Sequence, residues 1–175
     1  MASTTAASAL VPAQVGTRVI AYIIDGLILT FAAFFVIVPI LISAVIQGDP
    51  SLGRTISASV LYAIISFFYF GYTWTSWRAS PGQRLMGLST VDANTGAALT
   101  WSRAGVRWAY LFGPSALQSI FTNSEQVGGF LSFIVSLALI GYYIYLLRSA
   151  MQDARGQAYH DKQSSTIVVR TETSA

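Results

Sequence analysis

An arginine and an aspartate begin the first long apolar run of the sequence. Arg18 and Asp25 are seven residues apart, and Asp25 is the sole charged residue after Arg18 in a run that continues to Ile46. On a helix, residues i and i+7 lie on one face about two turns, or about 10 Å, apart. A charge inside a bilayer costs about 2.5–3.5 kcal/mol on insertion scales, so Asp25 must face protein or water and have a partner.

The chemistry open to Asp25 is either ion binding or ion pairing. A desolvated carboxylate in a membrane can exchange a proton or hold a cation. Ion pairing with an arginine instead keeps a carboxylate ionised and makes it a poor proton carrier. Because arginines are frequent near the ends of the apolar runs, we favour a structural pair. We expect Arg107 as the partner, with Arg18 or Arg103 as second choices, in one polar cluster.

A second acid stands beside the single histidine, in His160-Asp161. Such a pair can act as a proton-responsive group or a general base. However, adjacent residues on a helix do not face each other, and this segment lies outside the apolar runs. We therefore expect Asp161 to cap or anchor the C-terminal segment, through Arg84 or Arg78.

The segment Ser80-Pro81-Gly82-Gln83-Arg84 offers a further candidate site. Exposed backbone N–H groups together with Arg84 can bind a lipid phosphate. The alternative is a turn that ends the preceding helix, since Pro and Gly are common in turns. We favour the turn.

Composition restricts the class of protein. Hydrophobic residues make up 54% of the 175 residues and charged residues only 10%, against about 25% charged in soluble domains, so we expect a membrane protein. Ten Lys and Arg residues are spread along the chain without a basic run, which argues against nucleic acid as a partner. The sequence has no Cys and one His, and it lacks a phosphate loop or nucleophile elbow. We expect no enzyme activity, cofactor or metal.

The apolar runs predict an all-α integral membrane fold, a four-helix transmembrane bundle. Its spans are predicted at about 18–46, 56–77, 104–122 and 127–147. Between the second and third spans, residues 85–91 and 97–100 flank Asp92-Ala93-Asn94-Thr95-Gly96, and Asn and Gly favour a tight turn. We predict a small cytoplasmic β-hairpin there. Residues 1–12 and 171–175 are predicted to be disordered tails of a transmembrane domain spanning 13–170.

The distribution of basic residues favours four spans over three. With four spans, nine of the ten Lys and Arg residues fall on one side, and Arg54 alone falls on the other. Three spans would divide the basic residues between the two sides, against the positive-inside rule. The alternative for residues 104–122 is an interfacial helix. With four spans, both termini are cytoplasmic.

Several motifs occur in an order that resembles the RDD family of bacterial membrane proteins. The residues that carry the resemblance are Arg18 and Asp25, then Ser80 to Leu88 with Gly82, Arg84 and Gly87, then Asp92 and Gly96, then Arg103 and Arg107, and finally His160, Asp161 and Thr166. The family is named for one arginine and two aspartates. Arg18 and Asp25 match the first two positions, and Asp161 fits the second aspartate best, with Asp92 as the alternative. Lys162 to Ser165 depart from the small Ala-Gly pair usual in the family.

The resemblance implies a multi-pass protein of the bacterial inner or plasma membrane. It also implies transport of a ligand, as monovalent cation/proton antiport in some members, or an accessory role in others. We predict a non-enzymatic module that is a partner or accessory subunit of a membrane complex. The alternatives are a transporter of monovalent cations, protons or another small ligand, and a lipid-handling module. Its expected partners are the lipid bilayer and either further copies of the chain or other membrane subunits.

Overall fold

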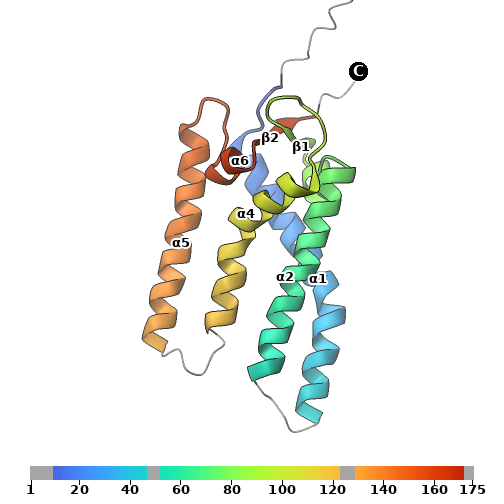
Figure 1. The fold of residues 1–175 in the computed structure, drawn as a ribbon, viewed down its shortest axis with the longest axis vertical. Coiled ribbons are helices and arrows are strands. Elements are labelled where there is room, and N and C mark those ends of the chain that lie inside the picture. Colours follow the sequence, from blue (N-terminus) through green and yellow to red (C-terminus); the bar gives the residue numbers. More distant parts are fainter. Residues whose placement is uncertain (1–9, 47–51, 123–128, 172–175) are drawn as a thin grey trace, which may run out of the picture.

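The computed structural model describes residues 10–46, 52–122 and 129–171. Four long helices run alongside one another in Figure 1: α1 (Val15–Ile46), α2 (Leu52–Ser76), α4 (Trp101–Thr122) and α5 (Gly129–Gln152). The short elements gather at one end of these helices: α3 (Pro81–Leu85), β1 (Leu88–Asp92), α6 (Tyr159–Gln163) and β2 (Thr166–Arg170). We call this end, formed by α3, α6, β1 and β2, the polar cap.

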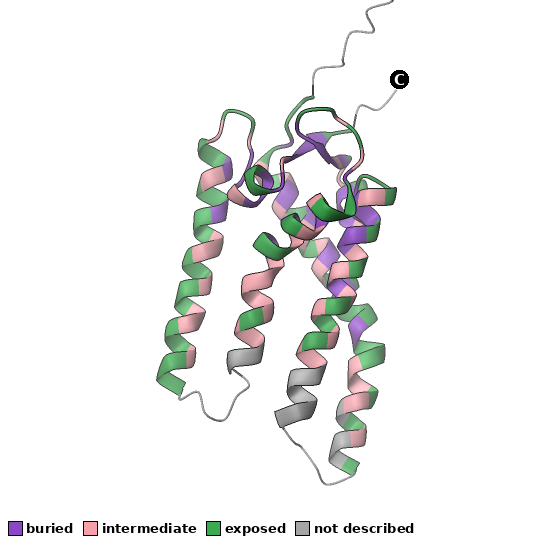
Figure 2. Ribbon diagram, in the orientation of Figure 1, coloured by how far each residue is buried: buried purple, intermediate pink, exposed green. Residues whose placement is uncertain are grey.

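The fold is mostly helical, as predicted, and two of its helices are long and apolar enough to cross a membrane. These are α1 over its first 26 residues and α5 over its 24 residues. Figure 2 shows α5 largely exposed, with its buried residues near the polar cap. Exposed apolar faces of this kind suit a lipid environment. The helices α2 and α4 occur where the second and third spans are predicted, and their crossing of the membrane stays a prediction.

An aromatic core joins α1, α2 and α4 below the polar cap. Phe70 and Trp74 of α2 are at most 1% exposed and pack together with ring centroids 4.9 Å apart. Phe112 of α4 stacks on Phe70 at 4.6 Å and meets Tyr22 of α1 edge to face. Large rings in such arrangements bury much apolar area and fix the helices against each other.

The predicted hairpin between residues 85–91 and 97–100 is wrong in its second strand. β1 pairs instead with β2, antiparallel, from Leu88 opposite Arg170 to Asp92 opposite Thr166. The predicted turn does form, because the Gly96 N–H donates to the Asp92 carbonyl at 2.9 Å. Beyond it the chain leaves the sheet, since Leu99 packs into the helical core.

The predicted disorder of residues 1–12 is wrong for residues 10–12, whereas residues 1–9 and 172–175 lie outside the described part. The Val11 carbonyl accepts from the Arg170 N–H at 3.0 Å, and the Ala13 N–H donates to the Val168 carbonyl at 3.0 Å. Pro12 forms a bridge with Val169. β2 therefore has hydrogen-bonded partners on both of its edges, β1 on one and residues 11–13 on the other, and it holds the segment before α1 against the C-terminal segment.

The pairing of β1 with β2 predicts a specific disulfide. The hydroxyl oxygens of Ser89 and Thr171 are 3.0 Å apart, so S89C with T171C should oxidise to a crosslink. In the hairpin expected from the sequence, residue 100 would lie opposite residue 89. S89C with T100C is therefore the matched control pair, and it should stay reduced. The chain has no native Cys, so intact mass after mild oxidation reads each pair directly. A crosslink between residues 89 and 100 but not 89 and 171 would contradict the sheet described above.

Candidate functional site

An arginine of α4 lies at the centre of the polar cap. Arg107 is 0% exposed, and its Nη1 atom forms an ion pair with Asp161 Oδ1. The same Nη1 atom donates to the Thr166 hydroxyl at 2.6 Å, and Nη2 donates to the Tyr22 hydroxyl at 2.8 Å. The guanidinium also lies 5.1 Å from the ring centre of Trp74. Arg107 therefore links α1, α2, α6 and β2 to α4.

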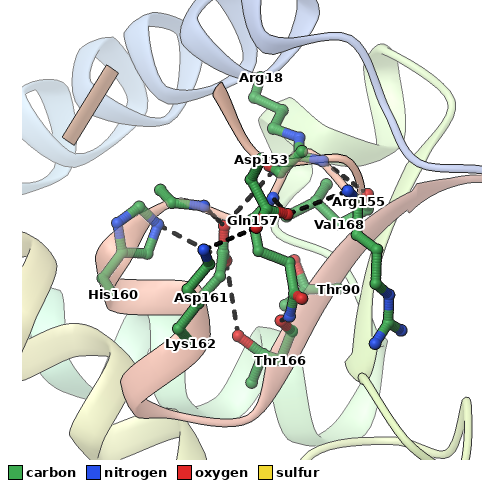
Figure 3. Close-up of polar contacts among 12 residues, drawn as sticks. Arg18, Thr90, Asp153, Arg155, Gln157, His160, Asp161, Lys162, Thr166 and Val168 are labelled. Carbon is green, nitrogen blue, oxygen red and sulfur yellow. Dashed lines mark hydrogen bonds and ion pairs between the residues drawn. The ribbon is translucent and has the colours of Figure 1, made fainter. Parts of the chain in front are cut away.

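A second arginine reaches the same carboxylate from α1. Arg18 Nη1 lies 3.4 Å from Asp161 Oδ2 and donates to the Gly156 carbonyl at 2.6 Å. Its Nη2 donates to the Val168 carbonyl at 3.0 Å. Figure 3 shows Arg18 on one side of Asp161 and Thr166 on the other. Asp161 thus lies between two guanidinium groups, and both of its oxygens are occupied.

Asp161 also caps its own helix, and it stays ionised. Its Oδ2 accepts from the Ala158 N–H at 2.9 Å. Burial is the largest single influence and raises the pKa of Asp161, but the neighbouring groups together, led by the positive charge of Arg107, outweigh burial, and the pKa is lowered from its ordinary value. The prediction that Asp161 anchors the C-terminal segment is confirmed. The predicted anchors Arg84 and Arg78 are wrong, because Arg107 and Arg18 take that role.

The neighbouring histidine is neutral and does not form a general-base pair with Asp161. His160 Nε2 lies 3.6 Å from Asp161 Oδ1, which is beyond hydrogen-bonding distance. Burial lowers the pKa of His160 to about 4 and outweighs the attraction of Asp161. His160 is 6% exposed, and its Nδ1 atom has no hydrogen-bond partner among the described residues.

Asp25 belongs to a separate site between α1, α2 and α3. It is 0% exposed, and its Oδ1 accepts from the Tyr69 hydroxyl and the Gly82 N–H, each at 2.8 Å. Its Oδ2 accepts from the Ser80 hydroxyl at 2.5 Å. The predicted ion pair of Asp25 with Arg107 is wrong. The start of α3 docks on α1 and supplies neutral donors, while the C-terminal segment supplies the carboxylate that Arg107 binds.

The close docking of α3 on α1 requires a glycine. A Cβ atom at Gly82 would overlap the Ala21 carbonyl oxygen and lie 2.9 Å from the Asp25 carboxyl carbon. Ser80 forms a capping box with Gln83: the Gln83 N–H donates to the Ser80 hydroxyl at 3.4 Å, and the Ser80 N–H donates to Gln83 Oε1 at 3.0 Å. The expectation of a turn at residues 80–84 is thus met by one capped helical turn.

The other predicted residues lie around these two sites. Arg84 is exposed and stacks on Trp77 at 4.7 Å. Asp92 forms an ion pair with Arg103 at the surface. Gly87 has a φ of 63°, and its N–H donates to the Arg84 carbonyl at 3.1 Å, which closes the turn before β1, while its own carbonyl accepts from the Thr171 N–H. Arg103 is therefore separate from the cluster of Arg18 and Arg107 that the sequence predicted.

Sequence reasoning missed three residues that complete the sites, namely Tyr22, Tyr69 and Gln83. Gln83 Oε1 also accepts from Trp74 Nε1 at 3.2 Å and from the Thr90 hydroxyl at 3.0 Å. The Ser-x-x-Gln spacing was the available signal for Gln83. The two tyrosines lack a comparable signal, because Tyr is frequent in apolar helices near membrane surfaces.

The polar groups of the two sites bind one another and hold separate segments of the chain together. Within the described ranges, no group of three or more His, Cys, Asp or Glu residues is arranged to hold a metal. The carboxylates of Asp25 and Asp161 are both occupied by donors from the protein itself. The arrangement ties the start of α1, the start of α3 and the C-terminal segment to the helices.

Comparison with known proteins gives one match. The model of the RDD family matches residues 12–165, which contain both sites except Thr166 and Val168 of β2. The resemblance drawn from the sequence is thereby confirmed. No curated protein matches and no solved structure matches.

Removing the central carboxylate tests the importance of the polar cap. Asp161→Asn leaves two buried guanidinium groups without their counter-charge, so we expect a loss of about 3–5 kcal/mol in the free energy of unfolding. Asp153→Asn is the matched control, because Asp153 pairs with the half-exposed Lys162 and should cost less than about 1 kcal/mol. Tryptophan fluorescence during SDS titration of the protein in detergent micelles measures both. Equal losses would contradict a dominant role for Asp161.

The contact of Gly82 with α1 gives a second prediction. Gly82→Ala inserts a methyl group against the Ala21 carbonyl, so we expect a loss of about 1–3 kcal/mol. Gly26→Ala is the control, because a Cβ atom at Gly26 has no other atom within 4 Å. The same unfolding titration compares the two, and a Gly82→Ala protein as stable as the Gly26→Ala protein would show that α3 does not dock closely.

Proposed function

Because the chain belongs to the RDD family of membrane proteins, we propose that it is a non-enzymatic, multi-span module that acts as a partner or accessory subunit of a membrane complex. The observation that carries the proposal is the state of Asp25. It is the sole carboxylate within the four long helices described, and it is fully buried with three protein donors on its two oxygens. Burial together with three protein donors leaves this carboxylate little room to bind a cation.

The proposed topology has four spans with both termini in the cytoplasm of a bacterial cell. The two apolar helices α1 and α5 support crossing of the bilayer. The helices α2 and α4, of 25 and 22 residues, pack beside α1 and are long enough to cross the ~30 Å hydrocarbon core. Nine of the ten Lys and Arg residues lie in the polar cap or in the loops and helix turns next to it, whereas Arg54 lies in the first turn of α2, which begins at the opposite end of the helices. The positive-inside rule therefore puts the polar cap in the cytoplasm.

The outer surface of the module is suited to a membrane partner or to further copies of the chain. Large apolar side chains are exposed along α5, including Phe130 at 80%, Phe133 at 57% and Ile140 at 56%. In a bilayer such faces contact lipid or other helices. The segments of the polar cap are joined by the β1–β2 pairing and by the ion pairs of Asp161, and we propose that they form one surface for a subunit on the cytoplasmic side.

A cavity between the helices supports a second candidate function, which is transport of a small ligand. It encloses about 330 Å³ between α1, α2 and α4. Its wall is largely apolar but includes the hydroxyl groups of Ser59, Tyr62, Ser66 and Ser115. The third candidate, lipid handling through Arg84 and Arg107, has less support, because Arg107 is 0% exposed and bound to Asp161.

Two measurements distinguish the partner role from the transporter role. We expect the chain, extracted from its native membrane in a polymer nanodisc, to co-purify with one other membrane protein in constant ratio. We also expect the purified chain in liposomes to show no cation-dependent proton flux above empty liposomes. Flux that Asp25→Asn abolishes and the surface control Asp153→Asn preserves would contradict the proposal and establish transport. Purification as a closed oligomer of this chain alone would contradict the partner role.

A further inference from the structure

An apolar groove lies between α1 and α5, next to the polar cap. It encloses about 300 Å³ and is lined by side chains from both helices, among them Val19, Ile23, Tyr143 and Leu147. Along α1 it extends from Val15 to Ile23, about 12 Å at the rise of a helix. We call it the α1–α5 groove. Its walls belong to the two helices that are apolar enough to cross a membrane, so it is in reach of lipid tails.

Two buried nitrogen atoms without hydrogen-bond partners, one from Arg18 and one from His160, lie at the capped end of this groove. Arg18 and His160 line it, and their side chains are 6% and 7% exposed. Neither Arg18 Nε nor His160 Nδ1 has a hydrogen-bond partner among the described residues. Buried polar atoms in proteins nearly always have a partner, so two such atoms in one groove indicate a missing ligand.

The charge around this end of the groove indicates an anion. Arg18 and Arg107 together carry two positive charges, and Asp161 alone supplies a negative charge to both. Asp25 is bound to neutral donors, and Asp153 is paired with Lys162 at 2.6 Å. One buried positive charge is therefore uncompensated among the described residues. Buried charges without a counter-charge are costly, and a bound anion relieves this cost.

We infer that the α1–α5 groove binds one anionic phospholipid, with an acyl chain along the groove and a phosphate oxygen at Arg18 Nε and His160 Nδ1. The Arg18 Nε–H is a donor in every state of the side chain. His160 Nε2 is too far from Asp161 for a hydrogen bond, so the proton can reside on Nδ1 and point to the phosphate. A charge-assisted hydrogen bond to a phosphate suits both groups.

The alternative occupant, a helix from a second copy of this chain, supplies no negative charge. In the described part of the chain, the long helices contain one carboxylate, Asp25, and it is buried. A soluble anion such as free phosphate would satisfy the polar end but leave the apolar walls exposed. This lipid site is distinct from Arg84, which stacks on Trp77, and the inference does not depend on the partner role proposed above.

Native mass spectrometry of the full chain, taken from nanodiscs of equal parts phosphatidylglycerol and phosphatidylcholine, tests the inference. We expect one retained phosphatidylglycerol per chain, favoured over phosphatidylcholine by at least about tenfold, because both lipids carry the phosphate but the choline group of phosphatidylcholine adds a positive charge to a site that already has one in excess. His160→Leu should reduce the retention of phosphatidylglycerol by about tenfold, since it removes the Nδ1 donor to the phosphate. Circular dichroism melting should show that the variant stays folded.

A second variant tests the apolar part of the groove. Ile23 lines the groove and is 58% exposed, so Ile23→Trp should fill the groove without unfolding the protein and should reduce retention of both lipids. Leu27→Trp, one turn further along α1 and 68% exposed, is the matched control and should leave retention unchanged.

Four results would overturn the inference. The first is that the wild-type chain retains the two lipids equally, and the second is that retention is unchanged in both folded variants. The third is that added inorganic phosphate releases the lipid and is itself retained in its place. The fourth is that the chain forms a dimer that holds no lipid.

Discussion

The ion pair between Arg107 and Asp161 is the interaction on which the polar cap depends. Arg107 is fully buried on α4, and a guanidinium in that position requires a counter-charge from elsewhere in the chain. Asp161 supplies it from the C-terminal segment, and in doing so it fixes α6 and β2 over the ends of the helices. Arg18 then binds the same carboxylate from α1. One acid near the end of the sequence thus connects the first and third long helices.

A second carboxylate performs a similar task by different chemistry. Asp25 accepts from Tyr69, Ser80 and the Gly82 N–H, so it joins α1 to α2 and α3 without an arginine. Hydrogen bonds from neutral donors satisfy its oxygens and leave the positive charge of Arg18 and Arg107 to Asp161 alone. That division produces the surplus of buried positive charge beside the α1–α5 groove. The structure of the two aspartate sites and the inferred lipid site are therefore linked by charge balance.

The sequence predicted the helices and the identity of the buried residues better than it predicted their partners. Hydropathy located the long helices, because the length of an apolar run in the sequence shows directly whether a helix of that length can cross a membrane. Arg18, Asp25, Arg107 and Asp161 were all identified, but Asp25 was assigned to Arg107. Sequence spacing places residues along one helix and carries little information about which distant segment docks on it. The same limit explains the hairpin, since nothing local to Asp92 or Leu99 indicates that β2, more than 60 residues later, pairs with β1.

Solid-state NMR distance measurements in lipid bilayers test the central claim most directly. With ¹⁵N-labelled arginine and ¹³C-labelled aspartate, the Asp161 carboxyl carbon should lie within about 4 Å of a guanidinium nitrogen, as in a charge-assisted hydrogen bond. The signal should weaken in Arg107→Lys, in which Arg18 remains near Asp161, and it should disappear when Arg18→Lys is added, while the Asp25 carboxyl carbon should show no arginine nitrogen at that distance. Coupling of arginine nitrogen to Asp25 and not to Asp161 would contradict the account.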